Sequence, residues 1–140
     1  MIHAIASLNP VAVLVVAFVG FCLGAFWYSP LLFVKPWMEE MKITPESMKK
    51  EAGRFPIVMG GALACTSVST LTLASLVAAH HCAGPLKGAE LGLLVGAGLV
   101  AARAGSNALF ESRTLRHYLI VAGHDVLLCV VQGAILAVWR

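Results

Sequence analysis

Five polar side chains interrupt apolar stretches in the last third of the chain, and we call them the polar cluster. They are Arg103, Asn107, His124, Asp125 and Gln132. Asn107 follows Arg103 by about one helical turn, and Gln132 follows His124 by about two. An imidazole beside a carboxylate can bind and release a proton near neutral pH, and a neighbouring guanidinium alters that affinity. The polar cluster therefore predicts a site that handles protons or a small solute.

Arg103 and Asp125 are expected to form an ion pair. Arg103 lies six residues before the end of its apolar stretch, and Asp125 lies seven residues after the start of the next one. At about 1.5 Å per residue, both lie roughly 9–10 Å inside the same membrane boundary. Opposite charges at matched depth on adjacent helices favour pairing, because an unpaired charge in lipid is costly. Such a pair suits either a proton site or a structural contact that fixes helix register, and both interpretations stay open.

Residues suited to catalysis or metal binding are scarce. His80, His81 and Cys82 share one loop, and His3 is expected on the same side of the membrane. Adjacent residues chelate one ion poorly, and the usual spacing of two to four residues is missing, so we expect no metal site and no cofactor. The sequence contains no nucleotide-binding loop, catalytic-triad order or zinc-protease motif. Because the polar cluster lacks a second carboxylate or a nucleophile, a protein without catalysis of its own is favoured.

The composition places the chain in a membrane. Of its 140 residues, 59% are hydrophobic and 12% are charged, and the mean hydropathy is +0.87. An ordinary soluble domain has roughly 45–50% and about 25%. A soluble domain of this size buries only about 70% of its unfolded surface, so the excess apolar residues would be exposed to water. The lipid bilayer is therefore the expected partner, and a soluble enzyme, a nucleic-acid binder and a disordered tail are excluded.

Four apolar stretches are long enough to span the bilayer. They cover residues 11–29, 57–79, 88–109 and 118–139. About 20 apolar residues in a helix cross the hydrocarbon core, and a single segment in lipid satisfies its backbone hydrogen bonds only as a helix. We therefore predict an all-α bundle of four transmembrane helices, formed by residues 1–140 as one integral membrane domain. Thr44, Pro45 and Glu46 predict a short cytoplasmic interfacial helix between the first two spans.

Basic residues predict the orientation in the membrane. The link between the first two spans and the link between the last two contain Lys35, Lys42, Lys49, Lys50, Arg54, Arg113 and Arg116. The opposite side contains only Lys87 and Arg140. Because cytoplasmic loops are enriched in lysine and arginine, both links are expected in the cytoplasm and both termini outside it.

Glycines recur at helical spacing in the first and third spans. They are Gly20 and Gly24 in the first span, and Gly84, Gly88, Gly92 and Gly96 in and before the third. Small residues four apart line one helix face and let another backbone approach closely in lipid. Such faces can pack within one chain or between chains. Because four short helices cannot turn every small-residue face inward, we predict a homo-oligomer.

The first span ends in a distinctive aromatic segment. It contains Trp27, Tyr28, Ser29 and Pro30, followed by Lys35 and Trp37. Pro30 has no backbone N–H and keeps Ser29 out of helical geometry, so the helix should end or kink at headgroup depth. Trp27 and Tyr28 would then anchor the bend, and Lys35 and Trp37 would hold the emerging chain at the membrane surface. A ligand-binding corner is the alternative interpretation.

The same segment resembles a known family. The run from Ala25 to Phe33, with Lys35 and Trp37, is similar to the first-helix signature of a bacterial membrane family, domain-of-unknown-function family 1761. Residues 107–111 and 133–135 resemble the third- and fourth-helix segments of that family. The resemblance implies a small four-helix protein of the bacterial inner membrane, with no assigned activity. The pair formed by residues 124 and 125 departs from it, because a less charged pair is expected there.

These features predict an integral membrane protein that passes or senses protons or a small solute through the polar cluster. One alternative is a non-catalytic structural or accessory subunit that binds another membrane protein. A second alternative is a protein that binds a lipid or quinone headgroup.

Overall fold

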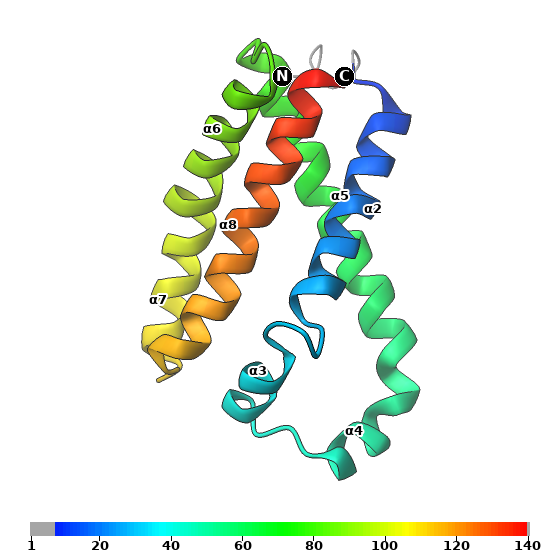
Figure 1. Ribbon diagram of the computed structural model, residues 1–140, viewed down its shortest axis with the longest axis vertical. Helices are drawn as coiled ribbons and strands as arrows, with labels where there is room; N and C mark the ends of the chain where they lie inside the picture. The colour runs from blue at the N-terminus through cyan, green and yellow to red at the C-terminus, as the bar shows by residue number, and fades with distance from the viewer. Residues whose placement is uncertain (1–7, 140) are drawn as a thin grey trace.

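The chain folds into four long helices. In the computed structural model, which describes residues 8–139, three of them are α2 (Pro10–Trp27), α5 (Phe55–Ala79) and α8 (Leu115–Val138) (Figure 1). The fourth joins α6 (Pro85–Val95), the π-helical η2 (Gly96–Ala101) and α7 (Ala102–Phe110) end to end. Each of the four is long and apolar enough to cross a membrane, and no strand occurs in residues 8–139. The predicted all-α class with four membrane-length helices is thus confirmed.

Two short helices occupy the connection between α2 and α5. They are α3 (Val34–Glu40) and α4 (Pro45–Glu51), and a 3-10 turn, η1 (Ala52–Arg54), leads from α4 into α5. Thr44 caps α4: its hydroxyl oxygen accepts from the Ser47 N–H at 3.2 Å, and Ser47 Oγ accepts from the Thr44 N–H at 3.0 Å. The start of α4 follows from the sequence, whereas α3 was not predicted.

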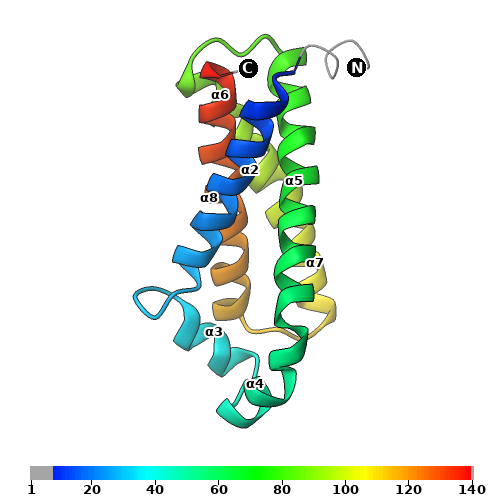
Figure 2. The ribbon, with the colours of Figure 1, turned by 90° about the vertical axis from the view of Figure 1, so that its right-hand side faces the viewer.

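Helix α8 is central in the bundle. The composite helix α6–η2–α7 packs along one side of α8, and α2 and α5 pack on the other (Figures 1 and 2). The best-buried large apolar side chains lie where α2 begins and α8 ends, and we call this the core end; they include Val16, Leu73, Val77 and Leu136. The opposite end, with α3, α4 and the α7–α8 turn, is the connector end. Toward it α5 leans away from the other helices, and its residues 60–65 are exposed (Figure 1).

Helices α6 and α8 approach so closely that no side chains separate their backbones. A Cβ added to Gly88 would overlap the carbonyl oxygen of Gly133, and a Cβ added to Gly92 would overlap that of Cys129. At Gly96 an added Cβ would lie 3.0 Å from a backbone atom of α8. These glycines therefore face α8 within one chain, where close backbone packing gives van der Waals contact.

The other three glycines of the predicted packing set differ among themselves. Gly20 and Gly24 also face α8, where the side chains of Gln132 and His124 occupy the space that a Cβ would need. Gly84 lies on no packing face, so its assignment to one is wrong. It is the turn residue before α6, with a φ of +88° that glycine adopts without strain. No atom of residues 8–139 lies within 4 Å of the position of its Cβ.

The π-helix η2 changes which face of the composite helix meets α8. A regular helix would continue the glycine face of α6 through positions 103 and 107. A π-helix bonds residue i to i+5, so it adds a residue to the turn and rotates α7 relative to α6. As a result Ala101 is buried, and a Cβ added to Gly105 would lie 3.3 Å from the Tyr118 ring. The Tyr118 hydroxyl donates to the Ala101 carbonyl oxygen at 3.3 Å.

We predict that Gly92→Ala lowers the free energy of unfolding by about 1–3 kcal/mol, the usual effect of overpacking. The added methyl group would meet the Cys129 backbone, which can yield only if α6 moves away from α8. Thermal unfolding of the full chain in detergent should therefore show a lower Tm. Gly53→Ala in η1 is the matched control, because no atom of the described chain lies within 4 Å of its Cβ position. Its Tm should stay the same or rise, and an equal loss in both variants would contradict the packing.

Candidate functional site

His124 on α8 lies in a compact site completed by the end of α2. Its Nδ1 is 3.0 Å from Asp125 Oδ1. Its ring centroid is 5.5 Å from that of Tyr28 and 6.1 Å from that of Trp27. Gly24 gives the imidazole room, because a Cβ there would lie 3.3 Å from His124 Nε2. We call these five residues the His124 site.

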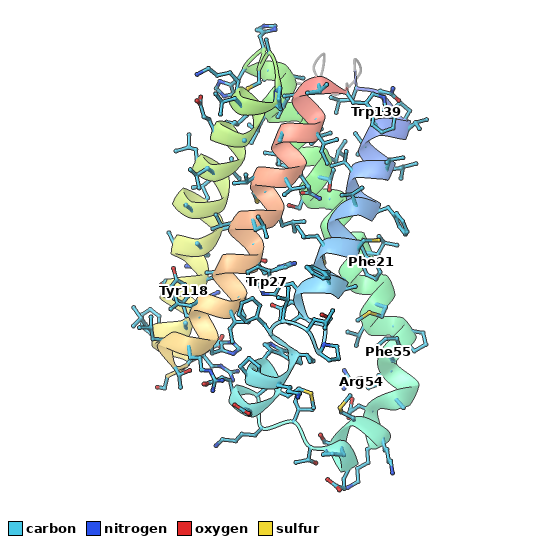
Figure 3. The ribbon with its side chains drawn as sticks, in the orientation of Figure 1. Phe21, Trp27, Arg54, Phe55, Tyr118 and Trp139 are labelled. Carbon is cyan, nitrogen blue, oxygen red and sulfur yellow. The ribbon has the colours of Figure 1, made fainter. Side chains whose placement is uncertain are left out.

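The corner after α2 brings the aromatic rings to α8. The helix ends at Trp27, shortly before the proline, in agreement with the expected end or kink. Trp27 Nε1 donates to the Ile120 carbonyl oxygen at 3.1 Å, and Figure 3 shows Trp27 between the end of α2 and α8. Trp37 of α3 packs against Tyr28 with a centroid distance of 5.6 Å. Aromatic residues expected at the membrane surface thus form one wall of the His124 site.

The remaining residues of the predicted aromatic segment lie around this corner. Ser29 Oγ accepts from the Leu31 N–H at 3.3 Å, within the turn that follows α2. Pro30 and Lys35 are both exposed. These three residues therefore flank the corner, and the aromatic rings make the contact with α8.

A buried nitrogen beside a carboxylate distinguishes the His124 site. The side chains of His124 and Asp125 are 14% and 30% exposed, and His124 Nε2 is buried without a hydrogen-bond partner in residues 8–139. A neutral His124 that donates from Nδ1 to Asp125 leaves Nε2 as a lone-pair acceptor.

The predicted ion pair between Arg103 and Asp125 is wrong. Asp125 contacts His124 instead, and the described part of the chain contains no ion pair of Arg103. The cause is η2, which rotates Arg103 and Asn107 off the face that meets α8 and leaves both exposed. The prediction assumed a regular helix. Gly96 and Gly98 within the stretch are the signal that could have indicated an irregularity.

Gln132 belongs to a separate polar contact closer to the core end. Its Nε2 donates to Thr70 Oγ1 at 2.7 Å, and both residues are fully buried. Thr70 Oγ1 donates in turn to the Thr66 carbonyl oxygen at 2.8 Å. Gly20 of α2 lies against the Gln132 amide and leaves space for it. The polar cluster expected from the sequence is therefore divided between two contacts of α8 and an exposed face of α7.

We predict that Thr70→Val lowers the free energy of unfolding by about 1–2 kcal/mol, because the buried Gln132 amide loses its acceptor. Unfolding of the full chain in a denaturant series would measure the change. Thr72→Val is the matched control, since the Thr72 hydroxyl donates to the Val68 carbonyl oxygen on an exposed face; its effect should be close to zero. A double-mutant cycle that finds no coupling between Thr70→Val and Gln132→Leu would refute the contact.

The histidines and the cysteine of the α5–α6 link do not converge. His80 and His81 are exposed, whereas Cys82 is buried at the core end. His3 lies outside the described residues. Within residues 8–139, no group of three or more His, Cys, Asp or Glu side chains is arranged to hold a metal ion.

The chain matches a protein-family model over almost its whole length. The model is described as "Protein of unknown function (DUF1761)" and covers residues 11–137. The chain belongs to the DUF1761 family. This match confirms the family resemblance of the sequence, and comparisons with curated proteins and with solved structures found no match. Because the DUF1761 description assigns no activity, any function must be inferred from the geometry of the site.

Proposed function

We propose that this member of the DUF1761 family is an integral membrane protein that senses protons through His124. The observation that carries the proposal is the buried Nε2 of His124, which has no hydrogen-bond partner in residues 8–139 while Nδ1 contacts Asp125. Gln132 Oε1 is also buried without a partner in these residues, but an amide oxygen does not take up a proton, whereas an imidazole nitrogen beside a carboxylate can.

The charge of the site favours the uptake of one proton. With His124 neutral and Asp125 ionised, the pair carries a single negative charge, and a proton on Nε2 would neutralise it. In surroundings of low dielectric, a neutral pair costs less than an isolated carboxylate.

The packing around His124 supports sensing over passage. Buried Leu128 lies on α8 between His124 and Gln132 and packs against Gly20, so an apolar side chain separates the two polar contacts. A protonated imidazole is attracted to the faces of aromatic rings within about 6 Å. The rings at this distance belong to Trp27 and Tyr28. Protonation would thus act directly on the corner that joins α2 to α3.

We predict one pH-dependent transition in Trp27 fluorescence that follows the protonation of His124. A protonated imidazole quenches a nearby indole, so the emission should fall as the pH is lowered. The measurement uses the full chain in lipid nanodiscs with Trp37→Phe and Trp139→Phe, which leaves Trp27 as the only tryptophan. His124→Gln should abolish the transition.

His80→Gln is the matched control for this titration, because His80 is an exposed histidine of the α5–α6 link. It should leave the transition unchanged. A transition that survives His124→Gln, or that is lost equally in both variants, would contradict the proposal. Proton flux into liposomes, followed with an entrapped pH dye, distinguishes passage from sensing: a flux that His124→Gln abolishes would replace sensing by proton transport.

A location in the bacterial inner membrane, with the connector end in the cytoplasm, belongs to the same proposal. The α2–α5 connection and the α7–α8 turn lie at one end of the bundle (Figure 1), so the basic residues of both links are gathered there. Lys87 lies at the other end, and Arg140 lies outside the described residues. The enrichment of lysine and arginine on the cytoplasmic side supports this orientation, with both termini outside the cytoplasm.

Self-association through α5 is a further part of the proposal. Most of the glycine faces that predicted a homo-oligomer pack inside the chain, but Gly60 and Gly61 have no atom of the described chain within 4 Å of their Cβ positions. Small residues on an open helix face suit contact with a second membrane helix. Light scattering in detergent should therefore give a mass above that of one 14.8 kDa chain. A monodisperse monomer would exclude the homo-oligomer.

A structural or accessory role is the second candidate function. It is favoured by the fully buried hydrogen bond between Gln132 and Thr70, which connects α5 and α8. Polar contacts of this kind hold membrane helices together without any change of state. In that role α5 would bind another membrane protein. His124→Gln would then change the stability of the chain but would not remove a pH-dependent transition in Trp27 fluorescence.

A further inference from the structure

A polar cavity lies at the connector end, between α7 and the start of α8. Its volume is about 190 Å³, and its polar lining residues are Asn107, Glu111, Arg113, His117 and Tyr118. His117 precedes His124 by seven residues, which is roughly 10 Å along α8. This cavity, which we call the turn cavity, is therefore separate from the His124 site.

Two side chains in the turn cavity suit a phosphate group. Arg113 donates from Nε to Glu111 at 3.1 Å and from Nη1 to the Met41 sulfur at 3.6 Å, and a guanidinium has further N–H donors. His117 Nδ1 is buried without a hydrogen-bond partner in the described part of the chain. Arginine and histidine both donate charge-assisted hydrogen bonds to phosphate oxygens.

Glu111 makes the turn cavity zwitterionic. Its carboxylate pairs with Arg113 at 3.1 Å, and its side chain is 58% exposed. Because this pair has no net charge, it favours a ligand that also contains both charges, with a phosphate at Arg113 and an ammonium at Glu111. A primary ammonium can donate hydrogen bonds to the carboxylate, whereas a trimethylated one cannot.

The size and the surroundings of the turn cavity point to a membrane lipid. At about 30 Å³ for each water, the cavity holds about six heavy atoms, which is enough for a phosphate group, and the rest of a headgroup would extend toward the exposed Glu111 carboxylate. Leu109, Phe110 and Leu115, at the adjoining helix ends, are 82%, 90% and 70% exposed. Acyl chains would therefore have apolar surface next to the cavity. The ends of membrane-length helices lie at headgroup depth.

We propose that the turn cavity binds the headgroup of a phospholipid with a primary ammonium group, such as phosphatidylethanolamine. Arg113 and His117 bind the phosphate, and the Asn107 amide supplies a further donor. Glu111 binds the ammonium. This site does not depend on proton binding at His124, so either proposal can fail without the other.

Native mass spectrometry of the full chain tests the proposal, after delipidation in detergent and addition of phosphatidylethanolamine, phosphatidylcholine or phosphatidylglycerol. We expect phosphatidylethanolamine to be retained about tenfold better than phosphatidylcholine, the effect of one charge-assisted hydrogen bond. Arg113→Gln should lower that retention about tenfold for the same reason. Glu111→Gln should remove the preference for phosphatidylethanolamine over phosphatidylglycerol. Inorganic phosphate in excess should not displace the lipid.

Arg54→Gln is the matched control, because Arg54 is an exposed arginine that pairs with Glu51 and does not line the cavity. Three results would overturn the proposal: equal retention of the three lipids, an equal loss in Arg54→Gln and Arg113→Gln, or displacement of the lipid by inorganic phosphate. If Arg113→Gln fails to fold, His117→Leu takes its place. Full retention of phosphatidylethanolamine by a folded His117→Leu chain would equally overturn it.

Discussion

Close backbone contact between α6 and α8 is the constraint on which the rest of the bundle depends. Gly88 and Gly92 let α6 lie on α8 without a side chain between them. Lipid supplies no hydrophobic driving force between helices, so van der Waals contact of this kind carries much of their association. With one side of α8 fixed against α6, the opposite side must receive α2 and α5. That opposite side carries His124 and Gln132.

Opposite each of these two polar side chains, α2 has a glycine, which leaves space for the polar group. Gly24 lies opposite His124, and Gly20 lies opposite Gln132. Glycine therefore has two uses in this bundle: it brings α6 to the α8 backbone, and it makes room for polar groups between α2 and α8. Each polar group makes one side-chain contact, Gln132 with Thr70 and His124 with Asp125. Each also has one buried atom without a partner in the described residues, Gln132 Oε1 and His124 Nε2.

The sequence predicts the four long helices because their length and apolar composition are set by the bilayer itself. It predicts the start of α4 for a local reason, the capping contact of Thr44. It fails for Arg103, because the spacing of apolar residues does not reveal the rotation at η2, which only Gly96 and Gly98 indicate. It also misses the contact of Trp27 with His124. That contact depends on how the corner after α2 folds back onto a helix almost one hundred residues later in the chain.

The hydrogen bond from Trp27 to the Ile120 carbonyl oxygen also has a consequence for biosynthesis. It joins the first long helix of the chain to the last. Proteins are synthesised from the N-terminus, so α2 reaches the membrane well before α8 exists. A nascent chain that lacks α8 would present Trp27 and Tyr28 without the helix that they contact. The His124 site is thus completed only when α8 is inserted, and any response at His124 is confined to chains in which α8 has reached the membrane.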